Sequence, residues 1–411
     1  MKNWEKNALA LFLIVAIVFI AILINSGTNA VDKPKYFISD TSGFFQRKIL
    51  YQNLTFSYDT FIIHSQQKEN IPGLAVAIVK DNQVIFMKAY GVKEFGTQDS
   101  VDINTVFRLG SVSKGFASVL TGILVDENIL SWDDQVIKYL PDFSLKDSAY
   151  TKQLTIRNIL SQTSGLPTHT YTDMLDYDVP YEQIRPMLSS VAPMCPPGKL
   201  YSYQNVAYSL IGDVLKSATG EDYNSLVSDK IFVPLYMQHA SIDFASIASD
   251  SNVAKPHLYA GKMVWKSQKL NDRYYSVAPA SGVNASISDM SKWLLALTGN
   301  YPEFIPENSL EEVYTPQIYT PIKRKFRHNW KNLDSLYYGL GWRVFKMNDK
   351  RIIYHGGYVK GYRAEIAVDY EEKAGIVVLF NSNCHLSNSC IPKFWELYFE
   401  DTKNANQLAI K

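Results

Sequence analysis

The sequence predicts an α/β (α+β) fold in which one antiparallel sheet is flanked by helices and joined to a mainly helical part. Strand-like segments occur near both ends of the chain, at residues 74–91 and 351–381, whereas the middle is mostly helical in pattern. The chain has 411 residues, 46% of them hydrophobic, and no repeat interrupts it, so one large core can form. The economical arrangement pairs the two groups of strands in one sheet and places helices on its faces.

The N-terminal segment is the first candidate element. Residues 8–24 are 17 consecutive apolar residues, preceded by Lys2 and Lys6. The run exceeds a usual signal-peptide core and is slightly short of a comfortable membrane span, and the small residues Thr28 and Ala30 frame a passable cleavage site. It is a signal peptide or a membrane anchor, and its length favours an uncleaved anchor. In either case we expect the rest of the chain on the extracytoplasmic side, periplasmic or at the cell surface.

The predicted domain organisation follows from this segment. Residues 1–35 form the signal or anchor with a linker, and residues 36–411 form one domain. Within that domain we expect an α/β part at about 50–115 and 285–400 and a helical part at about 116–284.

The composition excludes several classes of protein. Forty-one basic residues against 40 acidic ones argue against a nucleic-acid partner. Seven scattered histidines and three cysteines give no metal-ligand spacing, so we expect no metal and no cofactor. Cys384 and Cys390 are close enough to pair, and a free pair is an equal alternative. The oligomeric state is left open.

The remaining elements are predicted in chain order. A helix at 51–64 precedes a hairpin with arms at 74–79 and 84–91, and the first arm is continuously apolar, as a strand buried on both faces would be. Helices are expected at 116–125, 154–160, 208–218, 223–233, 288–297 and 391–400. The segment 136–140 ends at Pro141. Residues 168–198 and 240–280 read as loops or irregular structure. Strands at 351–354, 363–369 and 374–381 complete the pattern, with a turn at 371–373.

Ser111 lies where the buried helix at 116–125 begins, and Lys114 follows one helical turn later on the same face. Backbone N–H groups at a helix start can bind developing negative charge. A serine there with an amine in reach suits a nucleophile, its proton acceptor and half of an oxyanion hole. The plain alternative is an N-cap serine with a solvated lysine. Ser65 and Lys68 repeat the spacing without a buried helix after them, so spacing alone decides nothing.

Two later motifs could complete such a site. Tyr203 and Asn205 stand two apart on a loop before a helix, where they offer a phenol and an amide. By itself the pair is weak, because Tyr51 and Asn53 repeat it within a helix.

His355, Gly356 and Gly357 follow a strand and precede Tyr358. Two glycines let a substrate approach strand backbone closely. The plain reading of this segment alone is a turn with a surface histidine.

The ordered combination of Ser-x-x-Lys, Tyr-x-Asn and His-x-Gly resembles the serine β-lactamase and penicillin-binding-protein superfamily, specifically its class C β-lactamase branch. The resemblance covers roughly residues 55–395. It extends to flanking segments at 107–111, 163–167, 282–290 and 338–342. It implies a β-lactamase/transpeptidase-like fold.

The resemblance also implies roles. Ser111 would be acylated, and Lys114 and Tyr203 would share the proton transfers, with either one as the base. Asn205 would hold Lys114 and the substrate's acyl side. The oxyanion hole would consist of the N–H groups of Ser111 and Tyr358.

The third motif departs from the family, where Lys-Thr-Gly attracts a substrate carboxylate. Here the positions hold His355, Gly356 and Gly357. A histidine is mostly neutral at pH 7 and Gly356 has no hydroxyl, so carboxylate recognition is weakened unless another cation substitutes. An exported serine hydrolase acting on an ester, an amide or a peptidoglycan-derived peptide is therefore favoured over a strong β-lactamase. The alternative is a penicillin-binding sensor of the same fold that is acylated without efficient turnover.

Overall fold

The computed structural model describes residues 51–347 and 349–409. The predicted apolar segment at 8–24, the linker and the predicted domain start at residue 36 lie outside this range. Within it, no helix is both long enough and apolar enough to cross a membrane.

The predicted antiparallel sheet is present, and strands from both ends of the chain build it. Eight strands are hydrogen-bonded in the order β2-β1-β12-β11-β10-β9-β8-β7. Strand β1 pairs with β2 on one side and with β12 on the other, so the N-terminal hairpin joins the C-terminal strands directly. The strands of this sheet are β1 (Gly73–Lys80), β2 (Gln83–Gly91), β7 (Ile318–Tyr319), β8 (Leu333–Tyr338), β9 (Arg343–Met347), β10 (Lys350–Val359), β11 (Tyr362–Asp369) and β12 (Ala374–Phe380).

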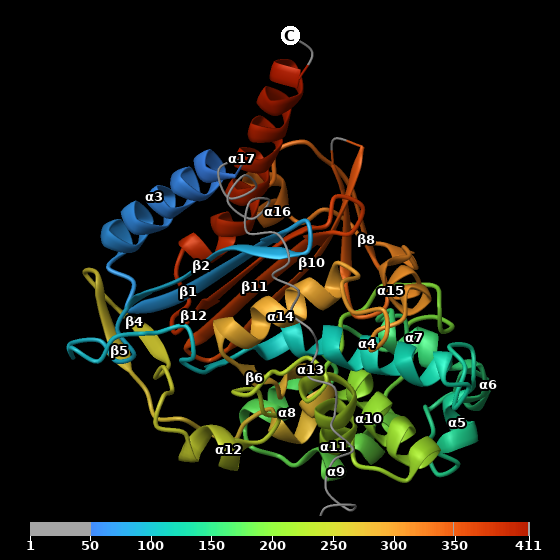
Figure 1. Cartoon of the computed structure of the whole chain (residues 1–411). Helices are drawn as coiled ribbons and strands as arrows, with labels where there is room; N and C mark the ends of the chain where they lie inside the picture. The colour runs from blue at the N-terminus through green and yellow to red at the C-terminus, as the bar shows by residue number, and fades with distance from the viewer. Residues whose placement is uncertain (1–50, 348, 410–411) are drawn as a thin grey trace, which may run out of the picture. The chain divides into compact units, whose positions relative to one another are not determined.

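Helices cover both faces of the sheet. Helices α3 (Gln52–Glu69) and α17 (Leu386–Ala409) lie on one face, and α14 (Ile287–Leu297) and α4 (Ser113–Asp126) lie on the other (Figure 1). Along β1, alternate residues belong to two separate apolar clusters, one on each face. Seven of the eight residues of β1 are buried, which confirms the prediction for its continuously apolar sequence.

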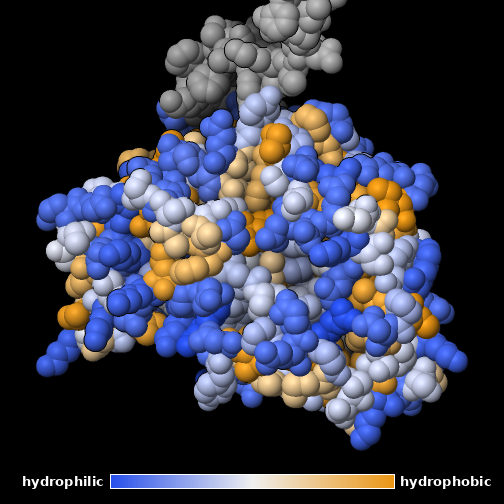
Figure 2. All heavy atoms as spheres, turned by 90° about the horizontal axis from the view of Figure 1, so that it is seen from below, coloured by the Kyte–Doolittle hydropathy of each residue, from blue (hydrophilic) through white to orange (hydrophobic). Residues whose placement is uncertain are grey.

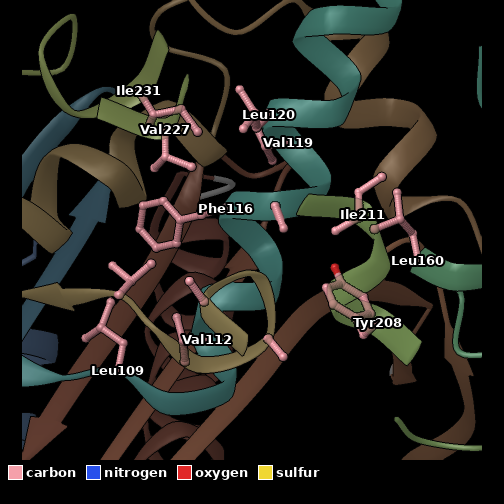
Figure 3. Close-up of a cluster of buried hydrophobic side chains, with 14 of the residues drawn as sticks. Leu109, Val112, Phe116, Val119, Leu120, Leu160, Tyr208, Ile211, Val227 and Ile231 are labelled. Atoms are coloured by element: carbon pink, nitrogen blue, oxygen red, sulfur yellow. The ribbon is translucent and has the colours of Figure 1, made fainter. Parts of the chain in front are cut away.

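The helical part packs around α4. In Figure 3, Leu109, Val112 and Phe116 contribute to one buried cluster with side chains from neighbouring helices. The Phe116 ring also stacks on Trp293 of α14, with ring centroids 4.1 Å apart. The other helices of this part are α5 (Val136–Tyr139), α6 (Ser148–Gln153), α7 (Ile156–Leu160), α8 (Thr172–Asp176), α9 (Tyr181–Ile184), η2 (Arg185–Ser190), α10 (Val206–Thr219), α11 (Tyr223–Val227), η3 (Ser228–Phe232), α12 (Phe244–Ser249), η4 (Tyr275–Val277) and α13 (Ala278–Ser281).

Several boundaries differ from the prediction. The first helix runs to Glu69 rather than ending at residue 64. The segment 154–160 is not one helix, because Leu154 and Thr155 are extended and Thr155 caps α7 with its side chain. Residues 240–280 include a hairpin of β4 (His257–Gly261) and β5 (Val264–Ser267). A small ladder pairs β3 (Phe107–Arg108) with β6 (Asn284–Ala285). Two helices near the sheet, α15 (Glu307–Tyr314) and α16 (Arg324–Asn329), were not expected.

Seen from below, the face in Figure 2 is mostly hydrophilic, and its apolar side chains form separated patches. Cys384 and Cys390 are both buried and both free, so the structure has the unpaired alternative.

Candidate active site

Ser111 lies in the single 3-10 turn η1 (Gly110–Val112) immediately before α4. Gly110 has φ +53°, and a Cβ on it would come within 2.7 Å of the Tyr358 backbone nitrogen. Only glycine therefore fits both the conformation and the space. The Ser113 hydroxyl donates to the Gly110 carbonyl and accepts from the Val283 N–H, which holds the turn in place. Ser111 remains partly accessible.

The Lys114 amine is fully buried directly behind Ser111. Its Nζ lies 2.8 Å from Asn205 Oδ1, 3.0 Å from the Ala280 carbonyl oxygen and 3.4 Å from Ser111 Oγ. A carbonyl and an amide oxygen can only accept, so a neutral amine uses its two N–H groups on them. The contact to Ser111 Oγ is the longest of the three, and it places the amine within reach of the serine hydroxyl.

Electrostatics favour that neutral amine. Burial, reinforced by the positive charge of Arg343, holds the pKa of Lys114 well below its usual range. Burial also raises the pKa of the Tyr203 phenol, although a hydrogen bond with Ser111 opposes the shift. The two shifts act in opposite directions, because a lowered pKa favours the neutral amine of Lys114 and a raised pKa favours the protonated phenol of Tyr203.

Tyr203 and Asn205 reach the site from the stretch that leads into α10. Asn205 occupies the N-cap position of α10 but makes no cap hydrogen bond, because its side chain serves Lys114 instead. The Lys114 amine lies 4.7 Å from the centroid of the Tyr203 ring and 5.3 Å from that of Tyr208. On the outer side, the His169 ring lies 5.6 Å from the Tyr203 ring.

The end of β10 supplies the opposite wall. Strand β9 pairs with β10 only as far as Tyr354, so the edge of β10 beyond it is not paired with β9. Val359 and Tyr362 close a two-residue turn, so the Val359 N–H points to β11 and the Tyr358 N–H points to the open edge. A Cβ on Gly357 would lie 1.8 Å from the Leu109 carbonyl oxygen, which shows how tightly β10 packs on the Ser111 turn. The Tyr358 N–H thus lies on the open edge of β10, beside the turn that carries Ser111.

His355 is buried, unlike the surface histidine of the plain reading. Its Nδ1 lies 3.0 Å from the Gly356 carbonyl oxygen and so carries the proton, and its Nε2 accepts from the Tyr338 hydroxyl at 3.1 Å. Burial and the neighbouring positive charge of Arg343 hold the pKa of His355 well below its usual range. This imidazole is neutral and already bonded, so it is not available as a cation for a carboxylate.

Comparison with known proteins shows the family and the fold of the chain. The sequence model of the Beta-lactamase family matches residues 59–386, most of the chain. The chain belongs to the Beta-lactamase family. Among solved structures it is similar to the octameric penicillin-binding protein homologue from Pyrococcus abyssi, with TM-score 0.70 and 23% identity over 80% of this chain and 73% of that one. That likeness confirms the predicted β-lactamase/transpeptidase-like fold.

Two proteins with curated names are similar to this chain in sequence. Protein flp of Staphylococcus aureus strain MW2 is 25% identical over 349 residues, which are 82% of this chain and 64% of that protein. Unguisins hydrolase ungD' of Aspergillus campestris is 27% identical over 308 residues, 73% of this chain and 56% of the relative. The chain thus spans less than two thirds of the length of these relatives.

Arg343 is a cation at the site that was not predicted from the sequence. It opens β9 opposite Tyr354, and its guanidinium lies 5.9 Å from the Tyr203 ring centroid. Three further rings surround it at 5.6 to 6.0 Å, those of Tyr201, Phe326 and Tyr338. Within the described residues it forms no ion pair. The signal was present, because Arg343 directly follows the family-like segment 338–342.

The repeated motifs lie elsewhere. Ser65 and Lys68 are on α3, which packs against α17 on the other face of the sheet. The Tyr51 hydroxyl donates to Asp81 at 2.8 Å. Neither of these repeated motifs contributes to the site. The folded structure therefore distinguishes the two copies of each motif, which the spacing in the sequence does not.

Proposed function

We propose that this Beta-lactamase family member is a serine hydrolase that forms an acyl-enzyme on Ser111. Its substrates would be esters, amides or peptidoglycan-derived peptides, as in the esterase and D-amino-acid or D,D-peptidase types of the class C-related branch. The observation that carries the proposal is the buried Lys114 amine, which lies 3.4 Å from Ser111 Oγ and is held there by Asn205 Oδ1 and the Ala280 carbonyl oxygen.

The acylation step follows from the site. Ser111 Oγ attacks the substrate carbonyl carbon, and its proton moves to Lys114 Nζ. The carbonyl oxygen becomes an oxyanion between the N–H groups of Ser111 and Tyr358, which are in place before the reaction. Collapse breaks the bond to the leaving group, which takes the proton through the protonated phenol of Tyr203. Water then attacks the ester carbon by the reverse proton path and releases the acid.

We further propose that Arg343 replaces the missing lysine of the third motif as the anchor for a substrate carboxylate. A guanidinium surrounded by aromatic rings and lacking a carboxylate partner in the described part of the chain fits a planar anion. Gly356 cannot supply the family's hydroxyl, because a Cβ there would lie 2.8 Å from Glu365 Oε2 and from the Tyr354 hydroxyl. This altered anchor argues against a strong β-lactamase.

Export is a separate proposal. The 17 apolar residues at 8–24 after two lysines support an extracytoplasmic location with the chain held at the membrane.

A substrate panel tests the proposal. Nitrophenyl acetate, a cephalosporin and a D-Ala-D-Ala peptide should separate esterase, β-lactamase and peptidase activity. Ser111→Ala should abolish turnover, and the matched variant Ser65→Ala should not. Stable labelling of Ser111 by a fluorescent penicillin with no turnover of any substrate would favour the sensor alternative.

A further inference from the structure

A basic segment lies beside the site. Residues 313–333 contain no acidic residue in a chain whose formal net charge is only +1. Within this stretch Lys323, Arg324, Arg327 and His328 are exposed on α16 or at its N-cap. We call these four residues the α16 basic patch. A local excess of one charge sign on a neutral protein focuses the field on one region of its surface.

The α16 basic patch continues the site outward from Arg343. Phe326, a buried residue of α16, lies under the Arg343 guanidinium. The distance from its ring centroid to Arg343 Cζ is 5.6 Å. Lys323 is close enough to lower the pKa of His169, whose ring lies beside Tyr203. The patch therefore adjoins the wall on which Arg343 and Tyr203 meet.

The patch cations are not neutralised. Among the described residues, no ion pair involves Lys323, Arg324 or Arg327, whereas the nearby Lys331 pairs with Glu396 at 3.1 Å. Unpaired surface cations keep their attraction for an external anion.

We propose that the α16 basic patch binds further anionic groups of a substrate whose first carboxylate is held by Arg343. The substrate class is an acidic peptide with at least two negative charges along its length. A peptide can enter the site and lie over the patch at once, which a lipid surface cannot do. The inference rests on the proposed role of Arg343, and it adds a second contact beyond the catalytic groups.

Fluorescein-labelled hexaglutamate is the probe. Its binding to the full chain carrying Ser111→Ala is measured by fluorescence anisotropy at low salt, so the result does not require turnover. The patch variant is Lys323→Gln with Arg324→Gln and Arg327→Gln. The matched control removes three exposed cations elsewhere, by Lys152→Gln, Lys262→Gln and Lys266→Gln.

We expect the patch variant to bind the peptide about tenfold more weakly, because each exposed cation contributes a factor of about 1.4 to 5. The control variant should bind like the parent, and hexaglutamine should not compete. On the Ser111 enzyme, hexaglutamate should inhibit nitrophenyl acetate hydrolysis competitively.

Equal losses in both variants, or no loss in either, would overturn the proposal. Binding to phosphatidylserine vesicles without competition from hexaglutamate would also overturn it and assign the patch to a membrane. If no substrate of the ester, cephalosporin and D-Ala-D-Ala panel is turned over by the Ser111 enzyme, the proposed function fails while the anisotropy result still stands.

Discussion

Arg343 should tune the basicity of Lys114 as well as anchor a carboxylate. Both side chains lie over the Tyr203 ring, with Lys114 Nζ at 4.7 Å and Arg343 Cζ at 5.9 Å from its centroid. They are therefore at most about 11 Å apart. At that distance two positive charges repel by about 1.5 kcal/mol with an effective dielectric constant of about 20. This corresponds to about one pKa unit.

The test variant is Arg343→Gln, and Arg343→Lys is its charge-preserving control. Removing the positive charge should raise the pKa of Lys114 by about one unit. Because Lys114 acts as the neutral amine, the acid limb of the pH profile should move to higher pH by the same amount.

The assay is kcat/KM for nitrophenyl acetate across a range of pH values. This ester is neutral, so loss of a carboxylate contact does not enter the result. Arg343→Lys should keep the acid limb of the parent. An acid limb that stays in place, or moves to lower pH, in Arg343→Gln would refute the reasoning.

Three further outcomes are expected. Gly357→Ala would place a Cβ 1.8 Å from the Leu109 carbonyl oxygen, so it should displace the Tyr358 side of the oxyanion hole. We expect kcat to fall at least about a hundredfold, and circular dichroism checks that the variant is folded. Gly356→Thr should not create β-lactamase activity and should lower the unfolding temperature, because its Cβ would meet the Glu365 carboxylate; a gain in cephalosporin hydrolysis would contradict this. Burial raises the pKa of Asp369 to about 6, compared with 3.8 in the unfolded chain. The protonated carboxyl therefore stabilises the fold below about pH 4, and this contribution to the free energy of unfolding is lost as the pH rises through 6. Asp369→Asn should therefore increase the free energy of unfolding, measured with urea, by about 2–3 kcal/mol at pH 7 and leave it unchanged at about pH 3.5.

The parts of the fold that could be predicted are those whose pattern is local. The hairpin of β1 and β2 follows from continuous apolar residues and a turn, and α4 follows from a segment that is apolar on nearly every side. Strands β7, β8 and β9 could not be predicted, because they are short or half-exposed and their order depends on pairing with β10.

The same distinction applies to the site. Ser111 and Lys114 are one helical turn apart, so their contact is encoded locally. The hydrogen bond to His355 Nε2 comes from Tyr338, which lies on another strand, and the burial that lowers the pKa of His355 is likewise a product of tertiary structure. Arg343 reaches Tyr203 only through the register of β9 on β10, and no spacing in the sequence reveals that contact.

Intact-protein mass spectrometry after incubation with a slowly hydrolysed nitrophenyl ester tests the central claim most directly. The account predicts one acyl adduct, mapped by peptide digestion to Ser111, present in Ser65→Ala and absent in Ser111→Ala. Lys114→Met should slow its formation by several orders of magnitude, because no other neutral amine faces Ser111 within the described residues. An adduct on any other residue, or unchanged acylation in Ser111→Ala, would contradict the account.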